Sequence, residues 1–212
     1  SNSPGNTISG TGADWIDPAF DKQGNMVFAP KPGSETTQDQ ALHLVYDAWN
    51  RLVEVWRDSN PNNYGTLVKT GNDADALLAT YRYDGLNRRI RAYERLTSAH
   101  RWVWEYYYNH GWQLLETRKN VSTAANEPSL STTLYEQYVW SPRYIDAPVR
   151  RHRDTNSDGT LDEMLYYTTD ANMSVTSLVN TSGTVVERYV YEPYGKVTVL
   201  DGSWSSQSWS TY

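Results

Sequence analysis

The sequence contains no cysteine, so disulfide bonds and thiolate metal sites are excluded. It also lacks an excess of basic residues, since 19 Lys and Arg against 25 Asp and Glu give a net charge of −6. Nucleic-acid binding requires positive charge opposite the phosphates, so DNA and RNA are poor partners for this chain. No apolar run approaches the roughly 18 residues of a membrane-spanning helix, and we expect no membrane span.

Phenylalanine is scarce as well, with 2 residues, yet the 212 residues include 17 Tyr and 9 Trp. Tyr and Trp join an apolar ring to a polar group, which suits positions that are buried on one side and wet on the other. An exposed β-sheet offers many such positions. The length fits one domain, or two small ones, and is sufficient to bury a core.

A seven-residue phrase recurs along the chain: an aromatic residue, then Asp, Asn or Glu, two free positions, Gly or Asn, a polar residue and an apolar residue. Its copies begin at Phe20, Tyr46, Tyr83, Tyr108, Thr169 and Tyr191. The copies at Tyr108 and Thr169 are weaker, and a degenerate copy at Tyr138 divides the longest gap into two similar parts. This regularity indicates an internal repeat.

Each copy of the phrase predicts a β-hairpin. Its first residue ends a strand, and the Asp or Asn that follows accepts a hydrogen bond from the backbone two residues on, which starts a type I turn. Gly or Asn in the fifth place supplies the left-handed conformation that closes such a hairpin. We therefore predict positive φ angles at Gly24, Asn50, Asn87 and Gly195. The apolar seventh residue begins the return strand.

The flanking segments also favour strands. In Arg101–Tyr108 the alternation directs Trp102 and Trp104 inward and Arg101 outward. Val175–Asn180 and Thr184–Tyr191 predict two strands around a second kind of hairpin turn. No segment predicts a convincing helix, although Asp73–Thr80 could form two turns at most. We therefore predict an all-β fold: an antiparallel sheet of repeated hairpins, curved or spiralling, with little or no helix.

The pattern divides the chain into three parts. Residues 1–19 form an N-terminal extended arm, residues 20–201 form the hairpin module, and residues 202–212 form a tail or an edge strand. Within the module, Ala29–Gln40 is rich in Gly, Pro, Ser and Thr and predicts a loop. The chain begins at Ser1 rather than Met and shows no signal peptide, so we expect a processed or excised piece.

The repeat resembles the YD repeats of the RHS family, which are named for the Tyr-Asp pair found here at Tyr46-Asp47 and Tyr83-Asp84. The resemblance runs from about Phe20 to about Asp201. It implies a long antiparallel sheet that spirals, in large proteins that are secreted or exposed on the cell surface. Some members enclose a toxin in a hollow shell, and others act in adhesion between cells. The family's conserved region after the last repeats has no counterpart here, so we expect that this chain does not enclose a cargo by itself.

The run from Asp154 to Glu163 is the strongest local signal for a ligand. It places possible calcium ligands at loop positions 1, 3, 5, 7 and 9: Asp154, Asn156, Asp158, the Thr160 carbonyl and Asp162. Gly159 stands at position 6, as in the first half of an EF-hand loop. Position 12 is Leu165 where a bidentate Glu is expected, and Glu163 could replace it only along a different backbone path. The alternative is a solvated hairpin turn without metal.

Catalytic motifs are lacking. The histidines show no metal-ligand spacing, and no HExxH or nucleophile elbow occurs. They are His43, His100, His110 and His152. We expect no enzymatic activity, and no cofactor other than calcium.

The aromatic residues allow a binding role. A sugar-stacking platform could be formed by Trp102, Trp104, Trp112 and Trp140, although alternation favours an inward, structural position for them. Glycosylation sequons occur at Asn120, Asn172 and Asn180.

The sequence thus predicts a non-enzymatic scaffold segment of a secreted or cell-surface protein. Two alternatives remain open: a self-assembling subunit of an extracellular fibre, and a carbohydrate-binding or adhesion module that uses aromatic side chains. The expected partners are other protein chains, or copies of this chain, that pair with the sheet edges. The arm at Ser1–Gly12 could add to a neighbour's sheet in this way.

Overall fold

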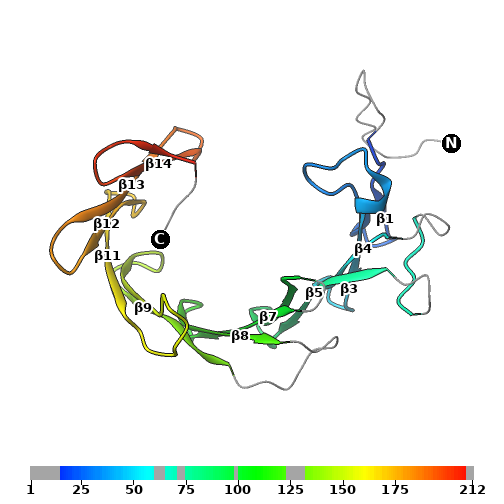
Figure 1. Ribbon diagram of the computed structural model, residues 1–212, viewed down its shortest axis with the longest axis horizontal. Coiled ribbons are helices and arrows are strands. Elements are labelled where there is room, and N and C mark those ends of the chain that lie inside the picture. Colours follow the sequence, from blue (N-terminus) through cyan, green and yellow to red (C-terminus); the bar gives the residue numbers. More distant parts are fainter. Residues whose placement is uncertain (1–14, 60–64, 71–74, 98–99, 123–131, 209–212) are drawn as a thin grey trace. The chain divides into compact units, whose positions relative to one another are not determined.

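A computed structural model describes residues 15–59, 65–70, 75–97, 100–122 and 132–208 (Figure 1). The described residues form fifteen strands in one antiparallel sheet, in which each strand lies beside its neighbours in the sequence. The helical content of this part of the chain is a single 3-10 turn, η1 (Gln38–Gln40). The predicted all-β class, with an antiparallel sheet of hairpins and little helix, is confirmed.

The strands follow one another along the described chain, with connections of different lengths between them. The first seven are β1 (Ala19–Phe20), β2 (Met26–Ala29), β3 (Leu42–Tyr46), β4 (Leu52–Arg57), β5 (Ala76–Tyr83), β6 (Arg89–Arg95) and β7 (Arg101–Tyr108). The next four are β8 (Leu114–Ser122), β9 (Thr133–Trp140), β10 (Pro148–Arg153) and β11 (Glu163–Thr169). The last four are β12 (Val175–Asn180), β13 (Val185–Tyr191), β14 (Val197–Asp201) and β15 (Ser206–Gln207).

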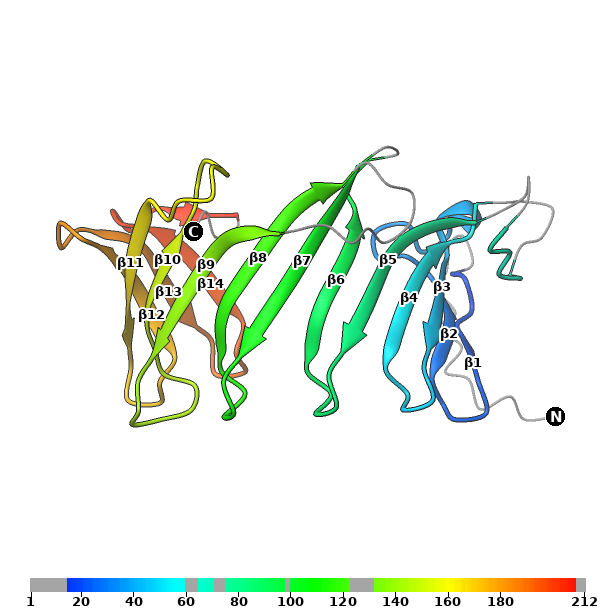
Figure 2. The same cartoon turned by 90° about the horizontal axis from the view of Figure 1, so that it is seen from below.

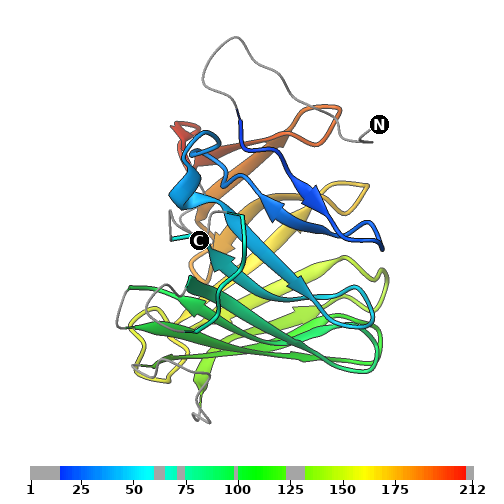
Figure 3. The same ribbon diagram turned by 90° about the vertical axis from the view of Figure 1, so that its right-hand side faces the viewer.

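The described residues group into two compact units. The first runs to Val103 and includes Val121, and the second consists of Trp104–Asn120 and the residues from Thr132 on. In the first unit, each of the strands β1 to β6 is antiparallel to the next. Figure 3 shows these strands in colours from blue to green. Within each unit, no helix or second sheet among the described residues covers the strands.

The segment at Asp73–Thr80 corrects one prediction, because it contributes a strand and not helical turns. From Ala76 onward its residues belong to β5, where Ala76 pairs with Arg57 and Thr80 pairs with Glu54. Residues 73 and 74 lie outside the described part. The helix propensity of Ala and Leu is small compared with the hydrogen bonds that β4 and β6 offer on both sides.

Burial in β7 also differs from the prediction. Arg101 and Val103 are buried, whereas Trp102 and Trp104 are half-buried. In a sheet without a covering layer, a large ring extends beyond the side chains beside it and stays partly wet. A short side chain such as that of Val103 is covered completely by its neighbours.

A small apolar cluster anchors the start of the described chain. Ile16, Phe28 and Ala41 are buried against one another, and the Ile16 amide donates to the Glu35 carbonyl at 2.9 Å. The chain from Ile16 therefore packs on the sheet before β1 begins. The preceding part of the predicted arm, residues 1–14, lies outside the described residues, as do residues 209–212 of the predicted tail. Among the described residues, no helix is long and apolar enough to cross a membrane.

Candidate functional site

The hairpin between β5 and β6 shows how the repeated phrase is built. The Asp84 amide donates to the Arg88 carbonyl at 3.0 Å, and the Asn87 amide donates to the Asp84 carbonyl at 3.2 Å. One carboxylate oxygen of Asp84 accepts the amides of Leu86 and Arg88, at 2.8 and 3.0 Å. Asn87 has a φ of 65°, so the chain turns through the left-handed region. This is a type I turn closed by a left-handed residue, as the phrase predicted.

The same turn occurs eight times in the described residues, and we call it the Asx turn. Its first residue, the acceptor residue, is Asp21, Asp47, Asp84, Asn109, Asp170, Asn180, Glu192 or Asp201. The residue three places later has positive φ in every case: Gly24, Asn50, Asn87, Trp112, Met173, Gly183, Gly195 and Trp204. The predicted positive φ angles at Gly24, Asn50, Asn87 and Gly195 are thereby confirmed.

The boundaries of the hairpins also agree with the phrase. In all six predicted copies the first residue ends a strand, as Tyr46 ends β3. The seventh residue begins the return strand, as Leu52 begins β4. The degenerate copy at Tyr138 corresponds to the connection between β9 and β10, a wider loop in which the Ser141 amide donates to the Ala147 carbonyl at 2.8 Å.

Two Asx turns were missed by the phrase. The connection between β12 and β13 was predicted to be a different kind of turn, but the side chain of Asn180 accepts the amides of Ser182 and Thr184 at 3.0 and 2.9 Å, as in the other copies. The turn at Asp201 follows the same scheme. Both lack the aromatic residue in front. At Asn180 the later places of the phrase are filled, with Gly183 fifth and Val185 seventh, and could have identified the turn; at Asp201 the acceptor residue was the main signal.

Three of the left-handed positions carry bulky residues, which is unusual. One of them is Met173, with a φ of 65°. Replacing Met173 by Asn, the residue found at Asn50 and Asn87, should relieve local strain and stabilise the chain by about 0.5–1 kcal/mol in denaturant melts. The matched change Ala171→Asn, in the same turn, should have no such effect. A destabilised Met173→Asn variant would contradict the role assigned to this position.

Three turn carboxylates, those of Asp21, Asp47 and Asp84, have pKa values below their ordinary value. For Asp21 the main cause is the hydrogen bond from the Asn25 side chain. For Asp84, desolvation raises the pKa, but the hydrogen bonds from the Arg88 side chain and from the turn amides outweigh it. The pKa of Asp47 is lowered in the same way as that of Asp84: desolvation raises it, but hydrogen bonds from Arg51 and from the turn amides outweigh this effect.

A lowered folded-state pKa predicts sensitivity to acid. The stabilisation is present above the unfolded-state pKa, ordinarily 3.8, and is lost as the pH falls through the lower folded-state value. We expect the melting temperature to drop steeply in that window. The triple variant Asp21→Asn, Asp47→Asn, Asp84→Asn should show a shallower drop, since Asn keeps the acceptor oxygen without titrating, as Asn109 and Asn180 already do. An unchanged slope in the triple variant would refute this explanation, and Asp39→Asn serves as the control outside the turns.

Neighbouring turns in the first unit are linked by side chains. Figure 2 shows the β1–β2, β3–β4 and β5–β6 connections along one edge of this unit. The Asn25 side chain donates to Asn50 Oδ1 at 3.0 Å, and Arg51 donates to the Asp84 carbonyl and to Asn87 Oδ1 at 3.1 and 3.2 Å. The guanidinium of Arg51 also lies over the rings of Trp49 and Tyr83. The sixth place of the phrase thus connects one hairpin to the next.

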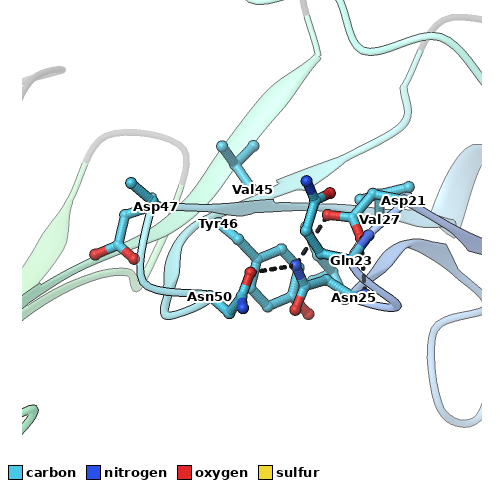
Figure 4. Close-up of a pocket in the computed structure, with 10 residues that line it drawn as sticks. Asp21, Gln23, Asn25, Val27, Val45, Tyr46, Asp47 and Asn50 are labelled. Atoms are coloured by element: carbon cyan, nitrogen blue, oxygen red, sulfur yellow. Dashed lines mark hydrogen bonds between the residues drawn. The ribbon is translucent and has the colours of Figure 1, made fainter.

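A shallow groove of about 440 Å³ lies between the first two turns (Figure 4). Asp21, Asn25, Asp47 and Asn50 line its turn side, and Val27 and Val45 line its strand side. The hydrogen bond between Asn25 and Asn50 crosses it. Because the polar side chains bind one another, the groove is better suited to joining hairpins than to holding a ligand.

A second groove, of about 370 Å³, lies in the second unit between the Asn109 turn and the β9–β10 loop. The Gln113 side chain spans it and donates to the Ile145 carbonyl at 2.8 Å. Tyr144 and Ile145 line the groove and are 50% and 53% exposed, and nearby Trp112 is 54% exposed. The inward position predicted for Trp112 is therefore wrong, since this residue stands in the turn itself. Trp140 is half-buried and donates to the Leu114 carbonyl at 2.7 Å.

The predicted calcium loop connects β10 and β11, and its side-chain oxygens accept hydrogen bonds from other residues of the same loop. Asp154 is 1% exposed and accepts the amides of Ser157 and Gly159 at 2.6 and 2.8 Å. Asp162 accepts the amide of Thr155 at 2.9 Å and also its hydroxyl. These contacts are those of a hairpin loop that satisfies its own amides.

The other carboxylates of the predicted site are also engaged by protein groups. Asp158 accepts the amide of Thr160 at 2.7 Å and the side chain of Asn156 at 3.1 Å. Glu163 pairs with Arg151 and Arg153, at 3.3 and 3.0 Å. In the described part of the chain, no group of three or more His, Asp or Glu residues could hold a metal ion. The calcium site therefore stays a prediction.

A chelator separates the two interpretations of this loop. The hydrogen bonds favour the hairpin turn, so we expect the melting temperature to be the same with calcium and with a chelator. A fall with the chelator that excess calcium reverses, and that Asp158→Ala abolishes, would instead establish a calcium site.

One buried group of titratable residues was not foreseen. His43 in β3 lies with its Nε2 at 3.5 Å from Asp58 Oδ2 and 4.0 Å from Asp75 Oδ2, and all three side chains are nearly inaccessible. The carboxylates also accept amides from Gly65, Ser59 and Val68. Asp58 and Asp75 are far apart in the sequence, so no local spacing could have revealed them. The arrangement fastens the β4–β5 connection to the sheet.

The other predicted site residues lie in separate elements and do not form a common site. His100 bonds Thr97 at 3.1 Å, His110 is exposed in the Asn109 turn, and His152 lies in β10. Of the sequons, Asn172 is exposed in a turn and Asn120 lies in β8. Asn180 is an acceptor residue whose Oδ1 is engaged.

No protein-family model and no curated protein matches the sequence.

Proposed function

We propose that this chain is a non-enzymatic scaffold: a segment of a secreted or cell-surface protein that extends a β-sheet hairpin by hairpin, in the manner of YD repeats. The observation that carries the proposal is the Asx turn, repeated with the same backbone bonds and a left-handed residue at eight connections. Repeat proteins of this kind obtain their stability from contacts between neighbouring units.

The chemistry of the turn supports a structural role. Seven acceptor residues hold two backbone amides each with one oxygen, and the eighth, Glu192, forms the turn with backbone bonds alone. The carboxylates of Asp21, Asp47 and Asp84, whose pKa values are lowered by these bonds, are poor general acids. In the first unit, the sixth-place side chains of Asn25 and Arg51 also join adjacent turns.

Electron microscopy of the purified chain tests the proposal against self-assembly. A scaffold segment should give discrete particles of single-chain mass, and light scattering should report the same mass. Regular fibres would overturn the scaffold in favour of the fibre subunit, and in that case removing residues 1–12 should weaken the fibres if the arm pairs with a neighbour.

Carbohydrate binding is the second candidate, because the exposed Tyr144 lines the groove beside the Asn109 turn next to polar side chains, and the exposed Trp112 belongs to the same turn. Flat aromatic faces of this kind suit sugar rings. A glycan array should then give signals that Tyr144→Ala removes and that Tyr166→Ala, a change of another exposed Tyr, retains. An array without specific signals excludes this candidate and leaves the scaffold.

A further inference from the structure

Three arginines gather at one edge of the first unit. Arg57 ends β4, Arg95 ends β6 and Arg101 begins β7, so the antiparallel order places all three at the edge opposite the β3–β4 and β5–β6 turns. Arg95 Nε and Arg101 Nη1 both donate to the Thr97 carbonyl, at 3.3 and 2.9 Å. Two guanidinium groups therefore converge on a single oxygen atom.

None of the three forms an ion pair with a described residue. Arg101 also donates to the His100 carbonyl at 3.2 Å, but carbonyl oxygens carry no net charge to balance a guanidinium. Arg101 is 9% exposed, and the Nε atoms of Arg57 and Arg101 are buried without a hydrogen-bond partner. Burial, together with the positive charges of Arg101 and Arg57, lowers the pKa of Arg95. Positive charge is thus concentrated here in a chain whose net charge is −6.

Other arginines of the chain lie close to carboxylates. Arg151 is 8% exposed, about as buried as Arg101, and its Nε is likewise unpaired, but its terminal nitrogens face Glu163 at 3.3 Å and Glu136 at 3.8 Å. Arg88 forms an ion pair with Asp84 at 2.7 Å. Where the fold buries a guanidinium for structural reasons, it provides a carboxylate, because an unbalanced buried charge is strongly destabilising.

We propose that Arg95 and Arg101, with Arg57 beside them, bind an oxyanion: a carboxylate, sulfate or phosphate group. The planar guanidinium presents paired donors that match two oxygens of such a group. The oxyanion balances the charge that the described residues leave unbalanced. This site lies outside the Asx turns and does not depend on the scaffold proposal.

The experiment measures the melting temperature at fixed ionic strength while sodium sulfate replaces sodium chloride, with phosphate and acetate as parallel probes. We expect a rise that saturates and that reaches about 3–6 °C at a concentration near ten times the dissociation constant. Arg95→Gln should lose the rise. The matched control Arg88→Gln, which removes an already paired guanidinium, should keep it. The probe with the largest rise identifies tetrahedral or planar oxyanions as the preferred ligand.

The same variants give a second result in chloride alone. Arg95→Gln should melt at the wild-type temperature or higher, because it removes a crowded cation without an acidic partner, whereas Arg88→Gln should melt lower. NMR of the arginine Nε–H groups in the wild-type chain should show sulfate-dependent shifts at Arg95 and Arg101 and none at Arg88. A melting temperature indifferent to all three anions, or an equal rise in Arg95→Gln, would overturn the proposal.

Discussion

Replacing His43 by Ala should destabilise the chain by about 3–5 kcal/mol in denaturant melts. His43 is the one described side chain able to carry positive charge within 4.0 Å of the carboxylates of Asp58 and Asp75, which are buried beside it. Without it, no described side chain that can carry positive charge lies within 4.0 Å of either carboxylate. The exposed His110 provides the control, and His110→Ala should change the stability by less than about 0.5 kcal/mol.

A double-mutant cycle distinguishes this explanation from a simple loss of packing against Phe28, whose ring centre is 4.9 Å from that of His43. Asp58→Asn should cost less in the His43→Ala background than in the wild type, since the charge it removes is then unbalanced. Additive costs would show that the ring matters and the charge does not.

Replacing Gly195 by Val should destabilise the chain by about 1–3 kcal/mol. Gly195 has a φ of 84°, and an added Cβ would contact nothing within 4 Å, so the expected cost comes from the backbone conformation alone. Its turn is also the one in which the acceptor residue, Glu192, gives no side-chain bond to the backbone amides. Denaturant melts give the measurement.

Gly85 offers a matched control for that substitution. It too lies in an Asx turn with open space around it, but its φ is not positive. Gly85→Val should therefore cost much less than Gly195→Val. Equal costs at the two glycines would mean that the left-handed position is not what the turn requires.

Local chemistry accounts for how much of the fold was predictable. The phrase identified six hairpins, with their strand ends, because its bonds run between residues at most four apart, as in the Asp84 turn. Pairing between neighbouring hairpins then follows without further information. The phrase missed the Asn180 turn because the required aromatic residue is not part of the bonded turn.

What depends on distant contacts was not predictable. Asp58 and Asp75 meet His43 through the β4–β5 connection, and no spacing in the sequence records that contact. The burial of β7 was mistaken because alternation tells which residues share a face but not how completely their neighbours cover each of them. In the loop at Asp154 the sequence shows the spacing of the oxygens but not which amides donate to them, because the path of the backbone sets those bonds.

Hydrogen exchange of single amides, followed by NMR, tests the Asx turn most directly. The amides of Leu86 and Arg88 donate to the side chain of Asp84, and we expect them to exchange slowly. The amide of Gly85, in the same turn, should exchange at nearly the unfolded rate. In Asp84→Ala the protection of Leu86 should disappear while the neighbouring Asp47 turn keeps its own. Equal exchange of Leu86 and Gly85 in the wild-type chain would contradict the claim that the side chain of the acceptor residue organises the repeat.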